Sequence, residues 1–310
     1  MHPAGALKKM RGANAVSATL TLLAGCAAPS ANFSRAVPPP PAAAPLTQSQ
    51  SGDLLYVVNI GDSTVGVYEY PAGIKTGSLS GFSHPRAACT DAAGNVFIAN
   101  TGAHDVVEYA HGGSQPQRTL TDGNYDPAYC AADPLTGNLA VANHQSGKQR
   151  TGGSIAVYRR ARGMPQYFTG LHAYLSCAFD DHGDLFAVGE YDSNYYLQEL
   201  PRGAAAFTTI HVHALAVRYV GWDGKDVIDE VPETHWSAIY RLKISKTQAH
   251  LAGVTTVSRK GTAFFDRPRV IVTGQTGAAF FNYPSGSGPT RKVFDVQDPI
   301  ASVVSRAAPQ

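Results

Sequence analysis

Several patterns that would identify a chemistry directly are missing from this sequence. It contains no Cys-x-x-Cys and no paired histidines at the spacing of zinc ligands, so a thiolate metal site is not indicated. It also has no Gly-x-Ser-x-Gly and no glycine loop of the form that cradles phosphate. The 3.6-residue apolar period of helical repeats is absent from its repeating units, which excludes a helical solenoid.

A strong excess of charge is also absent. The chain has 25 basic and 23 acidic residues, and the predicted export signal contains three of the basic residues, Lys8, Lys9 and Arg11. Its removal leaves 22 bases against 23 acids, so the mature protein is nearly neutral. Nucleic-acid binding requires many phosphates to be neutralised at once, and we expect no nucleic-acid partner.

Cysteine is scarce. Apart from Cys26, the chain contains Cys89, Cys130 and Cys177, an odd number for an exported protein. Each falls in the expected innermost strand of a different repeat, where we expect buried thiols that behave as small apolar side chains. The alternative is a bridge between Cys130 and Cys177, which requires neighbouring inner strands within disulfide reach.

What the sequence does contain is a repeat. Residues 94–102 read Gly-Asn-Val-Phe-Ile-Ala-Asn-Thr-Gly, a short apolar run between two turns, as expected of a β-strand. Similar segments occupy 52–59, 137–143 and 183–189, and weaker ones 224–228 and 269–273. The first glycines of successive segments are roughly 41 to 46 residues apart, a period typical of four-stranded propeller blades.

A second apolar motif follows each of these segments in step, which indicates six units. Each unit is completed by a polar strand and by a run that precedes the first motif and is expected to line the central channel. The expected inner runs are 86–91, 128–133, 174–180, 214–217, 262–265 and 300–304. The sequence thus predicts an all-β, six-bladed β-propeller with four-stranded antiparallel blades. The first unit lacks an inner run, so we expect 300–304 to pair into the first blade and close the ring.

The N-terminus predicts export and a membrane anchor. Residues 1–25 combine basic residues, a short apolar stretch and a small-residue cleavage site, and the stretch is too short for a structural membrane helix. Leu23 to Cys26 reads Leu-Ala-Gly-Cys and resembles the bacterial lipobox, which implies lipidation of Cys26; an ordinary signal peptide is the alternative. Residues 26–52 form a Pro- and Ala-rich tether, 53–306 the propeller and 307–310 a tail. The expected location is the cell envelope, at the outer membrane or on the periplasmic or cell surface.

The repeat itself resembles a known family. The segments 91–100 (Asp-Ala-Ala-Gly-Asn-Val-Phe-Ile-Ala-Asn) and 106–109 (Val-Val-Glu-Tyr) are similar to the NHL-type repeat, and the likeness covers about residues 53 to 305. It is clear in the first three units and faint in the last two. The segments most resemble those of uncharacterised bacterial envelope proteins, which implies a six-bladed propeller and no established activity.

Candidate ligand-binding residues are expected at one mouth of the channel, where the loops after the second strands and before the inner strands converge. They are Asn59, Asn100, Asn143, His84, Tyr125, His172, Glu190 and Glu230. The three asparagines occupy the same place in three units, and capping of their own turns is the alternative role. The acidic residues of the fourth and fifth units offer a weak cation site, and solvated loops are the alternative. His211 and His213 would point to one face of a strand, as metal binding requires, but no third metal ligand can be identified.

Two functions are compatible with this pattern. The first is a binding or scaffold module, a monomer tethered by its N-terminal lipid, with an unknown protein or a small polar ligand as partner and no cofactor. The alternative is a lactonase-like propeller hydrolase or a propeller lyase, which needs carboxylates, amides or histidines on the inner strands to hold a metal. The expected inner runs are small and apolar, and their carboxylates (Asp91, Asp133, Asp180 and Asp223) stand at strand ends where they cap turns. The sequence therefore favours the binding module and predicts no metal site.

Overall fold

The computed structural model describes residues 52–146, 152–213, 217–274, 277–293, 296 and 298–308. All of them belong to the compact unit that spans Ala42–Gln310. The predicted signal segment, Cys26 and all but the last residue of the predicted tether lie outside the described residues. Within the described part of the chain, no helix is long and apolar enough to cross a membrane.

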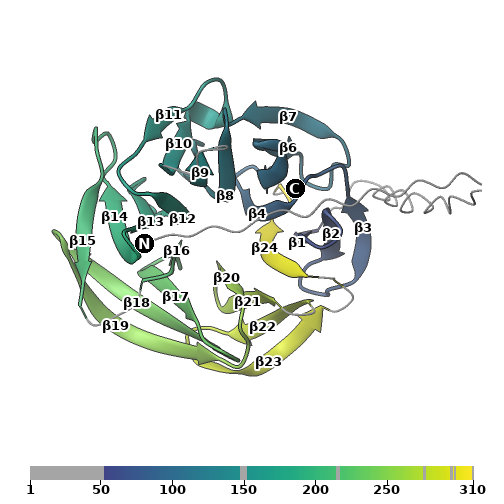
Figure 1. The fold of residues 1–310 in the computed structure, drawn as a ribbon. Helices are drawn as coiled ribbons and strands as arrows, with labels where there is room; N and C mark the ends of the chain where they lie inside the picture. Colours follow the sequence, from purple (N-terminus) through teal and green to yellow (C-terminus); the bar gives the residue numbers. More distant parts are fainter. Residues whose placement is uncertain are drawn as a thin grey trace, which may run out of the picture. The chain divides into compact units, whose positions relative to one another are not determined.

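The described residues form an all-β propeller fold with four-stranded antiparallel blades (Figure 1). The first sheet contains β24 (Pro299–Ser305), β1 (Leu54–Asn59), β2 (Thr64–Glu69) and β3 (Lys75–Leu79). The second contains β4 (Pro85–Thr90), β5 (Val96–Asn100), β6 (Asp105–Tyr109) and β7 (Pro116–Thr121). The third contains β8 (Tyr125–Ala132), β9 (Leu139–Ser146), β10 (Ser154–Tyr158) and β11 (Gln166–Phe168). Two short 3-10 helices, η1 (Thr101–Ala103) and η3 (Arg159–Ala161), follow β5 and β10.

The remaining strands form one twelve-stranded sheet instead of three separate ones. It contains β12 (Ala173–Phe179), β13 (Leu185–Tyr191), β14 (Asn194–Leu200), β15 (Thr208–Val212), β16 (Tyr219–Trp222), β17 (Val227–Pro232), β18 (Ser237–Ser245), β19 (Gln248–Val257), β20 (Thr262–Asp266), β21 (Arg269–Gly274), β22 (Gly277–Asn282) and β23 (Gly286–Val293). Consecutive strands pair antiparallel in groups of four, as in the other sheets. Short parallel pairings of the long strand β19 with β15 and β23 join these groups at their outer edges.

The core lies between neighbouring sheets, and strand alternation explains how each sheet supplies both of its faces. In β5, Val96 and Ile98 pack in a cluster with residues of the first sheet, while Phe97 packs with Cys130 and Leu139 of the third. Successive side chains of a strand point to opposite faces, so one strand contributes to two cores. This is why the repeated motif is apolar at every position instead of alternating with polar residues, and all five residues of β5 are buried.

The C-terminal strand closes the ring, as the sequence predicts. β24 pairs antiparallel with β1 from Leu54↔Ser305 to Asn59↔Pro299, so the first and last described strands lie side by side (Figure 1). The closure is buried: Val303 and Val304 are 1% and 2% exposed. Pairing of these strands leaves the first sheet with no open edge at the seam.

The turns between inner and second strands are capped by aspartates, as predicted. Asp91 Oδ1 accepts hydrogen bonds from the backbone N–H groups of Ala93 and Asn95, at 3.0 and 2.9 Å. Equivalent bonds are accepted by Asp133, Asp180 and Asp223. These four carboxylates have the turn-capping role that the sequence predicts.

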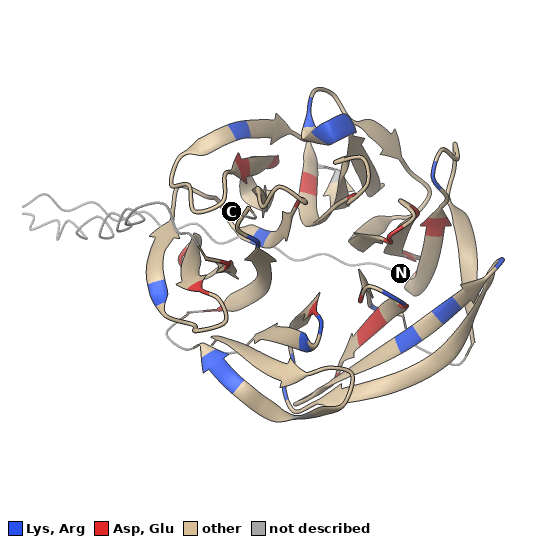
Figure 2. Ribbon diagram, turned by 180° about the vertical axis from the view of Figure 1, so that it is seen from behind, with Lys and Arg blue, Asp and Glu red and all other residues tan. Residues whose placement is uncertain are grey.

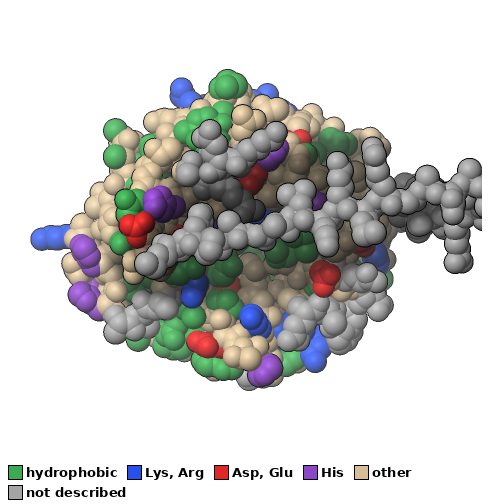
Figure 3. Space-filling model, in the orientation of Figure 1, with side chains coloured by type: hydrophobic (Ala, Val, Ile, Leu, Met, Phe, Trp, Pro, Cys, Tyr) green, Lys and Arg blue, Asp and Glu red, His purple; other side chains and the backbone are tan. Residues whose placement is uncertain are grey.

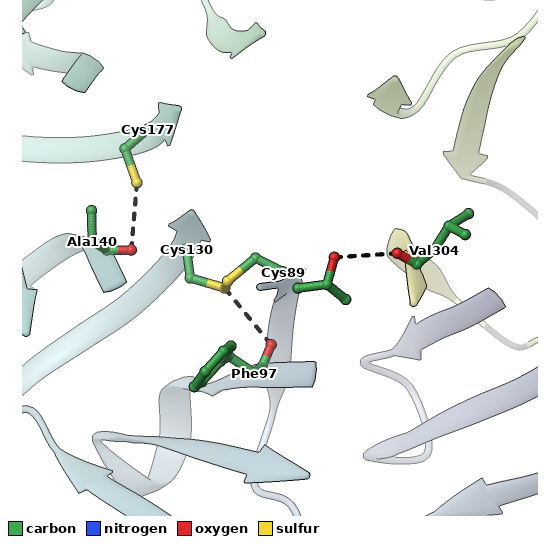
Figure 4. The surroundings of a disulfide bond; sticks show 7 residues. Cys89, Phe97, Cys130, Ala140, Cys177 and Val304 are labelled. Carbon is green, nitrogen blue, oxygen red and sulfur yellow. Dashed lines mark hydrogen bonds between the residues drawn. A yellow bond between two sulfur atoms is a disulfide. The ribbon is translucent and has the colours of Figure 1, made fainter. Parts of the chain in front are cut away.

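Two expectations about the inner strands are wrong. Cys89 of β4 and Cys130 of β8 form a disulfide, with Cα atoms 5.7 Å apart, and only Cys177 of the described cysteines is a free, buried thiol (Figure 4). Neighbouring inner strands converge near the axis, which brings their Cα atoms within disulfide reach. The fifth inner strand is also not at 214–217: β16 begins at Tyr219 and ends directly before Asp223, in the same relation to its capping aspartate as β4 has to Asp91.

Acidic and basic residues are interspersed around the ring, and neither sign occupies a whole face of the ribbon (Figure 2). Histidine side chains appear at several separate places on the face shown in Figure 3. Within the residues that the structure describes, no group of three or more His, Cys, Asp or Glu side chains is arranged to hold a metal ion.

Candidate functional site

The strand register brings the three predicted asparagines to equivalent positions. Asn59 and Asn100 end the second strands of their sheets, and Asn143 lies within β9, three residues before its end. Each pairs with a proline at or near the start of the inner strand: Asn59↔Pro299, Asn100↔Pro85 and Asn143↔Pro127. All three are buried, with 4%, 4% and 0% exposure. This end of the propeller, where the inner strands begin, is called the upper end below.

The buried asparagines face the protein interior. Asn100 Oδ1 accepts a hydrogen bond from the Ser83 N–H at 2.6 Å, and its Nδ2 donates to Asp105 Oδ1 at 2.9 Å. Asn143 Nδ2 donates to Ser154 Oγ at 3.0 Å. None of the three lines either of the two chambers of the channel described below. Asn100 therefore has the turn-capping role that the sequence offered as the alternative.

The other predicted residues are distributed around the upper end. His172 is exposed and its ring stacks on Tyr191 at 4.2 Å between centroids, with Nδ1 3.8 Å from Asp192 Oδ1. Tyr125 packs against Tyr167 with centroids 5.1 Å apart. His84 is exposed on the loop before β4, and Glu190 is half-buried at the end of β13. The structure does not bring these side chains together.

A cavity of about 200 Å³ lies among the first residues of the inner strands and is called the upper chamber. Its polar side chains are Arg86 of β4, Tyr129 of β8, His144 of β9, Tyr219 of β16 and Thr262 of β20. Apolar contacts come from Ala128, Leu175, Ile300 and Ala301. No carboxylate is among the described residues that line it.

Arg86 supplies positive charge to this chamber. Its side chain is exposed, and it forms no salt bridge with any carboxylate in the described part of the chain. Burial raises the pKa of Tyr219 and the nearby Glu230 raises it further, whereas Arg218 and Arg86 oppose this effect. Arg86 of β4 and Tyr219 of β16 line the same chamber, so the positive charge of the second sheet lies near the Tyr219 hydroxyl.

Glu230 is the one predicted residue that lies directly behind the chamber wall. It is 3% exposed, pairs with Tyr219 in the β16–β17 ladder, and its Oε2 accepts a hydrogen bond from the Ala263 N–H at 2.7 Å. Burial raises its pKa to about 8, and the neighbouring Asp229 adds to the increase. At neutral pH the Glu230 carboxyl is therefore mainly protonated, and it does not cancel the charge of Arg86.

Burial also raises the pKa of Tyr129, with a further contribution from Glu230. Both Tyr129 and Tyr219 therefore keep their hydroxyl protons at neutral pH and can donate hydrogen bonds. A guanidinium, two phenol hydroxyls and the Thr262 hydroxyl are groups that recognise an anion. The cavity is too small for a drug-sized molecule and has the size of a compact organic anion.

Sequence reasoning missed Arg86, Tyr129, His144, Tyr219 and Thr262. Tyr129 and Tyr219 each lie four residues before the aspartate that follows their strand, Arg86 lies five before Asp91, and Thr262 begins β20. Alignment of the repeats would have provided this signal. Tyr219 was hidden because the fifth inner strand was expected at 214–217. His144 is the immediate neighbour of the predicted Asn143.

Comparison with known proteins supports the fold and assigns no family. No family model matches the sequence, and no curated protein matches it. The chain is similar in structure to a protein of unknown function from Bacteroides caccae (TM-score 0.61, 10% identity, 83% of this chain and 100% of that one). It is also similar to a chain of the nidogen/laminin complex (TM-score 0.63, 11% identity, 83% and 99%) and to U3-55K (TM-score 0.54, 11% identity, 84% and 86%). At these identities the likeness shows a β-propeller fold alone.

Proposed function

We propose that this chain is a six-bladed, NHL-type propeller that serves as a binding module and takes a small organic anion in the upper chamber, without catalysis. Six blades are counted by treating each antiparallel group of four strands in the twelve-stranded sheet as one blade. The observation that supports the binding site is that Arg86 and Tyr219 line one chamber whose described lining contains no carboxylate.

The chemistry of the chamber favours a carboxylate-bearing ligand. Charge-assisted hydrogen bonds from a guanidinium are about twice as strong as neutral ones. The hydroxyls of Tyr129, Tyr219 and Thr262 can complete the coordination of the carboxylate oxygens. A lactonase-like hydrolase or a lyase is the alternative, and it would require a bound metal or another catalytic group among these residues.

The test uses isothermal titration of succinate and of inorganic phosphate into the full-length protein. Saturable binding of succinate is expected, weakened by about 10- to 100-fold in Arg86→Gln, since a hydrogen bond to a charged group contributes about 1.5–3 kcal/mol. Arg202→Gln is the control, because Arg202 is exposed in a turn and its substitution removes the same charge away from the chamber. Equal affinities of the two variants would place the anion elsewhere. A stoichiometric divalent ion in protein purified without added metal would favour the enzyme.

The membrane anchor belongs to the same proposal and has a separate test. Lipidation of Cys26 would hold the propeller at the extracytoplasmic face of a membrane through the Pro- and Ala-rich tether. Cys26→Ser is expected to abolish acylation and to release the protein from the membrane fraction. Retention of this variant in that fraction would show that Cys26 is not the anchor.

A further inference from the structure

The channel continues beyond the upper chamber into a second, larger cavity of about 390 Å³, called the lower chamber. It lies among the last residues of the inner strands, including Thr90 of β4, Ala132 of β8 and Phe179 of β12. Tyr129 is the only described residue that lines both chambers. Tyr129 therefore lies at the boundary between the two chambers.

The lower chamber is rich in aromatic rings. Phe179 of β12, Trp222 of β16, and Phe264 and Phe265 of β20 line it from three inner strands, and Tyr129 of β8 lines it as well. Trp222, Phe264 and Phe265 are half-buried, so part of each ring remains accessible. Aromatic surface of this kind gains free energy when a planar apolar molecule removes it from water.

Small side chains create the space. Ala88, Ala132 and Ala178 line the chamber together with the cysteines of the Cys89–Cys130 disulfide, and larger apolar residues at these positions would fill it. The cavity falls in the size range of small-molecule sites, about 300–1,000 Å³. Its volume is thus a consequence of the residues chosen at the inner strands, not of a single poorly packed position.

The chamber also offers a few polar groups. Each inner strand is the last of its group on the channel side, so its channel-facing edge carries backbone N–H and C=O groups without a strand partner. These strands are β4, β8, β12, β16, β20 and β24. At the rim, Trp222 Nε1 donates to Asp181 Oδ1 at 3.0 Å, which holds the indole in place. Mostly apolar walls with a small number of fixed polar groups are typical of ligand sites.

We propose that the lower chamber is a second binding site, distinct from the anion site, that takes a planar aromatic or heteroaromatic small molecule. The ligand stacks among Phe179, Trp222 and Phe265 and uses the strand edges for its polar atoms. Neither the closed ring nor the anion site requires this occupant, so the proposal stands independently of the function proposed above.

Trp222 makes the proposal measurable. The chain has two tryptophans, and Trp236 lies outside the chamber on the β17–β18 turn, so Trp236→Phe leaves Trp222 as the only indole. The probe is nitrobenzene, a planar aromatic that quenches indole fluorescence on contact. In the full-length Trp236→Phe protein, quenching is expected to saturate, with half-saturation at roughly 0.1–5 mM for so small a ligand.

A space-filling variant provides the decisive comparison. Ala132→Leu in the same background adds side-chain volume to the chamber and is expected to weaken the saturable quenching at least about 10-fold. Ala205→Leu is the control, because Ala205 is exposed in the turn between β14 and β15. A cooperative unfolding transition in urea reports that each variant is folded.

Two outcomes would overturn the proposal. Quenching that rises linearly with nitrobenzene and never saturates would show collisions with an unoccupied surface. Saturable quenching that Ala132→Leu leaves unchanged would place the probe in the outer groove that Trp222 shares with Phe186 and Lys225. Loss of succinate binding in Arg86→Gln has no bearing on either result, so the two sites are tested separately.

Discussion

Ser305 Oγ donates a hydrogen bond to the carbonyl oxygen of Gly94 at 2.5 Å, so the last strand of the ring is held by the second sheet as well as by β1. His111 Nδ1 lies 2.7 Å from the same hydroxyl. Because Thr90 Oγ1 also donates to the Val304 carbonyl at 3.2 Å, β24 is attached on both sides. Closure of the ring therefore depends on contacts with two neighbouring sheets.

This arrangement predicts a difference between two equivalent glycines. Gly94 and Gly137 both have positive φ, +84° and +70°, so Gly→Ala should cost about 1–2 kcal/mol at either position. A Cβ on Gly94 would in addition overlap the carbonyl oxygen of Arg306, whereas Gly137 has nothing within 4 Å. Gly94→Ala should therefore lower the free energy of unfolding by about 1–3 kcal/mol more than Gly137→Ala. Equal losses in urea denaturation would contradict the closure geometry.

The disulfide predicts unequal roles for the three described cysteines. Cys89 and Cys130 are 41 residues apart, and closing a loop of that length stabilises the folded state by about 4 kcal/mol in the chain-entropy account. Cys89→Ala together with Cys130→Ala should lower the free energy of unfolding by several times more than Cys177→Ala, which removes one buried sulfur for about 1 kcal/mol. Thiol titration of the denatured, unreduced protein should find Cys177 reactive and the other two blocked. Reactive Cys89 would disprove the pairing.

Glu230 predicts how stability changes with pH. Burial raises its pKa from 4.5 to about 8, so the folded state binds a proton that the unfolded state has lost over this range. The free energy of unfolding should therefore be highest below about pH 4.5, as far as Glu230 is concerned, and fall as the pH rises towards 8. Glu230→Gln should flatten this part of the profile, and Glu233→Gln, an exposed neighbour, should leave it unchanged. An unaltered profile in Glu230→Gln would show that Glu230 titrates normally.

Asn100 predicts a loss of stability without a loss of binding. Its replacement by alanine leaves the Ser83 N–H and Asp105 Oδ1 without their side-chain partner, at a cost of about 1–3 kcal/mol. Succinate affinity should not change, because Asn100 does not line the upper chamber. Asn124→Ala, at an exposed position, is the control and should have neither effect. A large loss of succinate affinity in a folded Asn100→Ala protein would show that the Asn100 amide contributes to the binding site.

The repeat was sufficient to predict most of the fold because its signals are local. Apolar runs between turns predict strands, the spacing predicts four-stranded units, and the capping role of Asp91 follows from its place at a strand end. The unpaired run at 300–304 predicts the closing strand, which β24 confirms. The joining of three groups of strands into one sheet was not predictable, because it depends on the unusual length of β19.

The site was predicted less well because it depends on distances across the axis. The disulfide required knowledge of how closely β4 and β8 approach, which no spacing in the sequence supplies. Arg86 and Tyr219 are 133 positions apart and belong to no shared motif, so only the closed ring brings them to one chamber. The upper chamber lies at the end of the inner strands where the mouth was predicted, and the three predicted asparagines are buried and do not line it.

The most direct test of the anion-binding channel is a crystal structure of the protein grown with succinate. The account predicts density for a carboxylate in the upper chamber, within hydrogen-bond distance of the Arg86 guanidinium and of the hydroxyl of Tyr129 or Tyr219. An upper chamber that contains only water at saturating succinate, with the Arg86 side chain turned away from Tyr219, would contradict it.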